Sequence, residues 1–179
     1  MSDNTIPILA NLDDVNQEIW ESDLILVRNR KGVCIHAAKA CRWDDKLFCI
    51  DVRKYRGVTA VPLEQLVKKY PGQVEIYEVN PQSRWENYDR PGAIRYLKGI
   101  LFSKEDYRTV LLETFRNLFS KLLRRSTEKQ QSIPYGAEAI RIAERLGGGV
   151  EPVPERVDER IGFADLEASP LYRYRFTLK

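Results

Sequence analysis

The sequence predicts a single α+β domain in which an antiparallel sheet packs against helices. Short runs of alternating apolar and polar residues, typical of strands, dominate residues 24–79. Longer runs with apolar residues every three or four positions, typical of amphipathic helices, dominate residues 90–146. The length of 179 residues and the hydrophobic content of 43% suit one globular core, so we expect one domain over residues 1–179.

The first 22 residues are expected to form a helical extension of this domain. Apolar residues recur at helical spacing over residues 12–20, and Ser22 with Asp23 ends that helix. Residues 24–27 are apolar without interruption, as in a buried strand.

Residues 33–40 contain His36, the only histidine in the chain, and alternate like a strand, with Cys34 and His36 on one side. A second strand, over residues 47–52, follows a polar turn at residues 42–45. Facing residues of a hairpin have a constant numerical sum, and this turn places His36 directly opposite Asp51. A carboxylate there would fix the tautomer of the imidazole, so the pair could orient a catalytic histidine. The alternative is a His–Asp contact with a structural role alone.

The remaining elements follow from the same patterns and from turn residues. We expect strands over residues 58–61, 74–79 and 172–176, and helices over residues 63–70, 90–101, 103–122 and 134–146. The polar residues 126–133 are expected to be a linker within the domain. The glycines at 147–149 follow a helix instead of opening one, so they do not form a phosphate-binding loop.

Composition and charge narrow the function classes. A net charge of +3 is too small to indicate nucleic-acid binding, and no apolar run is long enough to span a membrane. Residues 1–9 lack the basic-then-apolar signature of a signal peptide. We therefore expect a cytoplasmic protein without nucleic-acid partners and without a membrane span.

The three cysteines, Cys34, Cys41 and Cys49, are an odd number, which suits reduced thiols. Together with His36 they could be compared with a zinc site, but their spacing matches none of the paired Cys-x-x-Cys arrangements. We expect small apolar residues on buried strands instead, with no metal and no cofactor.

The start of the helix at Pro134 carries an unusual residue. Ser132 offers a capping hydroxyl, and Gly136 then lies inside the first turn, where glycine costs up to about 1 kcal/mol relative to alanine. The free N–H groups and the dipole of a helix N-terminus lower the pKa of a thiol. The sequence therefore places a residue without a side chain where a protein would favour a nucleophile.

Four short motifs, at residues 22–28, 34–37, 50–53 and 134–139, occur in an informative order. In this order the chain resembles the circularly permuted papain-like hydrolases of the NlpC superfamily, the YiiX/YaeF-like group. Members typically have a Gly-Asp-hydrophobic strand, a Ser-His-hydrophobic strand, an acidic or polar residue on the next strand and a Tyr/Phe-Cys-Ser-Glu helix start. The resemblance extends from Glu21 to the C-terminus and implies a permuted papain-like fold of the NlpC type.

The resemblance also implies roles for individual residues. His36 matches the general base, Asp51 the residue that orients it, and Gly136 the position of the nucleophilic cysteine. Tyr135 and Cys34 would then contribute to the substrate-binding site. In such hydrolases a thiolate attacks an amide or ester carbonyl, and the histidine protonates the leaving group. Without a thiol at position 136 this covalent route is absent, and Cys34, on the same strand as His36, is a poor substitute.

We therefore expect a thiol hydrolase of the peptidase, amidase or esterase type with a vacated nucleophile position, inactive as given. Its substrate would be a small molecule, a peptide or an acyl compound in a cleft between the His36 hairpin and the Pro134 helix. The alternative is a non-catalytic pseudoenzyme or binding domain that uses the same cleft. Either the cysteine has been replaced in this chain, or the protein is a natural pseudoenzyme.

Overall fold

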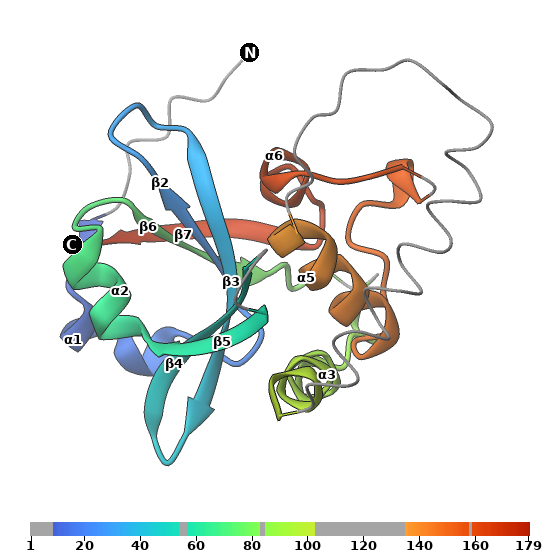
Figure 1. Cartoon of the computed structure of the whole chain (residues 1–179), viewed down its shortest axis with the longest axis horizontal. Helices are drawn as coiled ribbons and strands as arrows, with labels where there is room; N and C mark the ends of the chain where they lie inside the picture. The colour runs from blue at the N-terminus through green and yellow to red at the C-terminus, as the bar shows by residue number, and fades with distance from the viewer. Residues whose placement is uncertain (1–8, 54–56, 83–84, 103–134, 158) are drawn as a thin grey trace.

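A seven-stranded sheet forms the centre of the computed structural model, which describes residues 9–53, 57–82, 85–102, 135–157 and 159–179 (Figure 1). The strands are β1 (Leu9–Ala10), β2 (Leu24–Arg28), β3 (Cys34–Trp43), β4 (Lys46–Arg53), β5 (Gly57–Pro62), β6 (Val74–Val79) and β7 (Tyr172–Leu178). Their spatial order is β1-β7-β6-β2-β3-β4-β5. All neighbouring strands are antiparallel except β1 and β7, which are parallel. The sheet is therefore mixed, and the expectation of a purely antiparallel sheet is wrong at this edge.

Helices cover both faces of this sheet, which confirms the α+β class (Figure 1). The described helices are α1 (Leu12–Val15), α2 (Leu63–Lys69), α3 (Arg90–Phe102), α5 (Tyr135–Leu146) and α6 (Phe163–Glu167), with short 3-10 helices at Asn16–Glu18 and Pro154–Arg156. Side chains of α1 and α2 pack into one hydrophobic cluster, on what we call the α2 face of the sheet. Side chains of α3, α5 and α6 pack on the opposite face, which we call the α5 face.

The helix expected over residues 12–20 is shorter than its pattern indicates. It ends as an α-helix at Val15, continues as a 3-10 turn to Glu18, and leaves Trp20 64% exposed. A buried carboxylate explains the end of the helix, because Asp23 Oδ2 accepts the Trp20 backbone N–H at 2.9 Å and draws the chain away from the helical path. The expected helix over residues 103–122 and the expected linker over residues 126–133 lie outside the described residues.

The register of the β3–β4 hairpin differs from the expected one by two residues. Ala38, not His36, lies opposite Asp51, and Trp43 lies opposite Lys46. The turn consists of Asp44 and Asp45 alone, with φ of +46° and +63°, as in a type I′ turn. Because the shift is even, His36 and Asp51 stay on the same face and become diagonal neighbours.

A bulge at the start of β3 breaks the expected alternation. On β2, Val27 pairs with His36 and Arg28 pairs with Cys34, which leaves Ile35 as the additional residue of β3. Cys34 packs against the cluster on the α5 face, whereas the partner of His36, Val27, belongs to the cluster on the α2 face. The expectation that Cys34 and His36 share a side of the strand is therefore wrong.

The Asp44–Asp45 turn provides a test of the observed register. Asp45→Gly should raise the free energy of unfolding by up to about 1 kcal/mol, because glycine adopts positive φ without the steric cost of other residues. Asp45→Val should lower it, since a β-branched residue is strained there. Urea denaturation of the two variants measures both effects, and equal stabilities would contradict a two-residue turn at this place.

Candidate functional site

His36, Asp51 and Thr59 form a hydrogen-bonded chain across three neighbouring strands. His36 Nε2 on β3 contacts Asp51 Oδ2 on β4, and the Thr59 hydroxyl on β5 donates to Asp51 Oδ1. The Asp51 side chain is 1% exposed, whereas His36 is 18% exposed. The contact expected between His36 and Asp51 is thus present, although it crosses the hairpin diagonally.

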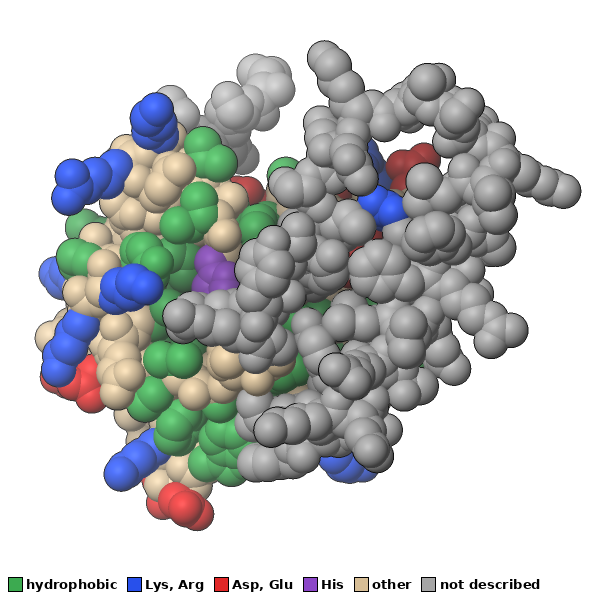
Figure 2. Space-filling view, in the orientation of Figure 1, with side chains coloured by type: hydrophobic (Ala, Val, Ile, Leu, Met, Phe, Trp, Pro, Cys, Tyr) green, Lys and Arg blue, Asp and Glu red, His purple; other side chains and the backbone are tan. Residues whose placement is uncertain are grey.

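This arrangement fixes which imidazole nitrogen can act as a base. An ionised carboxylate only accepts hydrogen bonds, so a neutral His36 carries its proton on Nε2 and leaves Nδ1 as the basic nitrogen. The histidine (purple) reaches the molecular surface beside hydrophobic side chains (green) in Figure 2. His36 therefore presents Nδ1 on the side away from Asp51, while Asp51, held by Thr59, orients the ring.

Gly136 lies in the first turn of α5, buried against the His36 end of the hairpin. A Cβ added at Gly136 would lie 3.3 Å from the Val52 carbonyl oxygen, 3.4 Å from the Phe163 ring and 3.8 Å from the Ala37 carbonyl oxygen. Val52 follows Asp51 in the chain, and Ala37 follows His36. The start of α5, whose first residue is Tyr135, thus lies against the backbone next to the dyad, but on the α5 face. The strand partners of His36 and Asp51, Val27 and Ala38, belong to the α2 face, so the two side chains of the dyad lie on the other face of the sheet.

The surroundings of Cys34 and Cys41 disfavour their thiolates. The Cys34 Sγ is half-buried and lies 3.5 Å from the His36 carbonyl oxygen, and burial raises the pKa of its thiol. Burial also raises the pKa of Cys41 to about 11. Cys41 and Cys49 are buried, as expected for small apolar residues on strands, and none of the three cysteines forms a disulfide within the described residues. They should react slowly at neutral pH, because the thiolate is the nucleophile.

A buried ion pair joins the strand that carries His36 to the helix that carries Gly136. Lys39 Nζ on β3 lies 2.7 Å from Glu144 Oε1 on α5, and both side chains are 0% exposed. The Tyr172 hydroxyl accepts from Lys39 Nζ at 3.0 Å and donates to Glu144 Oε1 at 2.7 Å. Burial lowers the pKa of Lys39, and the Glu144 carboxylate opposes this shift. Periodicity alone did not reveal this pair, because its partners are far apart in sequence.

A second set of contacts, made by one arginine and one glutamate, ties α5 to residues 151–161. Arg141 Nε donates to Glu151 at 2.9 Å, and its terminal nitrogens donate to the carbonyls of Arg156, Val157 and Glu159. Glu138 accepts the Ile161 N–H at 2.6 Å, and burial raises the pKa of its carboxyl. Helix α5 is therefore fixed both to the sheet and to the segment that follows it.

No protein-family model matches this sequence, and no curated protein matches it. Within the described ranges, no group of three or more His, Cys, Asp or Glu residues could hold a metal ion. None of the described helices is both long and apolar enough to cross a membrane. Any functional interpretation therefore depends on the geometry of the site itself.

The Lys39–Glu144 pair predicts a strongly non-additive mutant cycle. Lys39→Met or Glu144→Leu alone should lower the free energy of unfolding by about 3–5 kcal/mol, because each leaves one buried charge without its partner. The double variant should be more stable than either single variant. Urea denaturation of all four proteins measures the coupling, and additive losses would show that the two side chains do not interact.

The hydrogen bond from Thr59 to Asp51 can be tested with two matched substitutions. Thr59→Val keeps the shape but removes the donor, and it should lower the free energy of unfolding by roughly 1.5 kcal/mol. Thr59→Ser keeps the hydroxyl and should lower the free energy of unfolding by less than Thr59→Val does. Thermal or urea denaturation compares them, and a serine variant as unstable as the valine variant would argue against the bond.

Proposed function

We propose that this chain is a cysteine-hydrolase-type domain of the permuted papain-like kind, in which Gly136 has replaced the nucleophile. The observation that carries this proposal is the position of Gly136 beside the backbone of the His36–Asp51 dyad. As it stands, the domain would bind an acyl compound, a peptide or a related small molecule near His36 without forming a covalent intermediate.

The backbone at Ser22 gives independent support. Ser22 adopts a φ of +69°, in the left-handed region that glycine enters most readily. The resemblance is to proteins with a Gly-Asp pair where this chain has Ser22 and Asp23. A serine in a glycine conformation is consistent with descent from such a pair.

The chemistry of a restored site follows from the groups that remain. Because His36 lies on the α2 face here, its ring would have to turn around the end of β3 to take the proton of a thiol at position 136 on Nδ1. The thiolate would then attack an amide or ester carbonyl. The backbone N–H groups at the start of α5 would stabilise the oxyanion, and the His36 imidazolium would protonate the departing amine or alcohol. Water would then hydrolyse the thioester. Without the thiol, the helix start and His36 can bind a carbonyl or carboxylate but cannot form the thioester.

A second candidate function is a binding domain in which Gly136 serves packing alone. The tight space around position 136 favours it, since a side chain there requires Val52 or Phe163 to move by a few tenths of an ångström. In either case we expect a reducing, cytoplasmic setting, because Cys34, Cys41 and Cys49 form no disulfide within the described residues.

Gly136→Cys distinguishes the two candidates. If the site is of the hydrolase type, the new thiol should have a lowered pKa, because the helix N-terminus and His36 both favour the thiolate. Iodoacetamide at about pH 6.5 should label it faster than Cys34 and Cys41, whose thiol pKa values are raised by burial, and faster than the buried Cys49. Hydrolysis of p-nitrophenyl acetate should appear, and His36→Ala in the same background should slow the labelling and abolish the hydrolysis.

Two control variants separate the effect of position 136 on thiol reactivity from the effects of the helix dipole and of an added Cβ. Ala139→Cys places a thiol one turn further along α5, where it shares the dipole but not the position of Gly136. Gly136→Ala reports the effect of a Cβ on stability without a thiol. If the thiol at position 136 reacts no faster than the thiol at position 139, and His36→Ala changes nothing, the glycine serves packing and the hydrolase proposal is wrong.

A further inference from the structure

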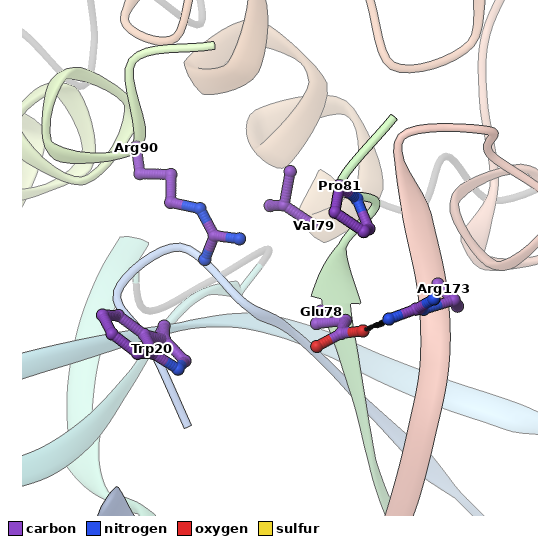
Figure 3. A pocket seen from close by; sticks show the side chains of 6 residues that line it. All are labelled: Trp20, Glu78, Val79, Pro81, Arg90 and Arg173. Atoms are coloured by element: carbon purple, nitrogen blue, oxygen red, sulfur yellow. Dashed lines mark hydrogen bonds and ion pairs between the residues drawn. The ribbon is translucent and has the colours of Figure 1, made fainter. Parts of the chain in front are cut away.

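A second site lies where β6 leaves the sheet. A cavity of about 530 Å³ opens there, lined by Trp20, Glu78, Val79, Pro81, Arg90 and Arg173 (Figure 3). It is separate from the dyad, because His36 pairs with Val27, which in turn pairs with Val74 at the other end of β6. Glu78 is four residues beyond Val74, roughly 13 Å along the strand.

One buried carboxylate organises two walls of this cavity. Asp23 is 0% exposed; its Oδ2 accepts the Trp20 backbone N–H at 2.9 Å, and its Oδ1 accepts from Arg90 Nη1 at 3.1 Å. Ser22, the residue before Asp23, adopts a positive φ, and its hydroxyl is hydrogen-bonded to the buried Tyr88 hydroxyl. Backbone strain of this kind persists only where surrounding contacts determine it, and it is often found at ligand sites. The walls are therefore ordered before a ligand arrives.

The cavity combines a flat apolar surface with positive charge. The Trp20 side chain is 64% exposed, and Figure 3 shows the Arg90 guanidinium directed toward the space beside it. Among the described residues both contacts of Arg90, to Asp23 and to the Glu21 carbonyl, use Nη1, so Nε and Nη2 keep N–H groups for a ligand.

The opposite wall carries an ion pair. Glu78 accepts from Arg173, which is 58% exposed, and its second oxygen lies 3.7 Å from Arg175 Nε. Arg175 also pairs with Glu18 at 2.6 Å, so it is neutralised outside the cavity. A ligand anion would therefore bind through the N–H groups of Arg90 that Asp23 and the Glu21 carbonyl leave unused.

We propose that this cavity binds a small molecule in which a flat apolar ring carries one carboxylate or phosphate group. The ring stacks on Trp20, and the anion accepts from Arg90 with Arg173 at the opposite wall. A cavity of this volume suits a ligand of such size. A neutral ring leaves the unused N–H groups of Arg90 without an acceptor, and a bare anion leaves the indole exposed, so both should bind more weakly.

The test is an NMR titration of the ¹⁵N-labelled full chain with phenylacetate and with phenyl phosphate, following the Trp20 indole N–H and the Arg90 Nε–H signals. Acetate, inorganic phosphate and benzyl alcohol serve as fragments that carry only one half of the chemistry. We expect saturable shifts with at least one of the two ring-bearing anions, and affinities at least about tenfold weaker for every fragment. The tighter of the two probes identifies the anionic group.

Three variants complete the test. Trp20→Ala and Arg90→Lys should each weaken the better probe at least about tenfold, since the first removes the ring and the second keeps the charge but loses the planar fork. Arg175→Gln removes a charge two residues from Arg173 on β7 without lining the cavity, and it should change the affinity less than twofold. Non-saturating shifts, equal binding of acetate, or unchanged binding by Trp20→Ala would overturn the proposal.

Discussion

The buried contact between Lys39 and Glu144 determines where the two halves of the candidate site lie. Lys39 is three residues from His36 on β3, and Glu144 is eight residues from Gly136 on α5. Taking both charges out of water costs several kcal/mol per ion, which only close geometry and further hydrogen bonds offset. Tyr172 supplies those hydrogen bonds. We interpret the pair as a device that favours one position of the helix on the strand, more than as a source of net stability.

The local pattern of apolar residues was sufficient to predict every described strand except β1, which lies in the expected helical extension, and to predict the contact between His36 and Asp51. It was not sufficient for the register, because the turn type depends on which two residues accept positive φ, and Asp44 and Asp45 do so here. Nor could it reveal the bulge at Ile35. Lys39 looked like a solvent-facing residue of a strand, since its partner Glu144 is 105 positions away and no local pattern joins them.

At Ser22 and Gly136 the residue type is the opposite of what the backbone conformation alone would favour. Ser22 has the positive φ that suits glycine, whereas Gly136 sits in ordinary helical backbone that any residue adopts. The glycine at position 136 is therefore required by no dihedral angle. What it does is allow the helix start to approach the Val52 carbonyl closely. A stability measurement alone would thus say little about the role of position 136, and reactivity is the informative observable.

The outer edge of β7 has a consequence for solubility. In the part of the chain that the structure describes, β1 pairs only with Thr177 and Leu178, so residues 172–176 of β7 form an open edge. An open edge rich in aromatic residues invites pairing with another chain and aggregation. Arg173 and Arg175 alternate with the aromatics there, and the register of β7 on β6 shifts at Arg175. Charged side chains and an irregular strand both disfavour the addition of a further strand, so we expect these arginines to reduce self-association through this edge.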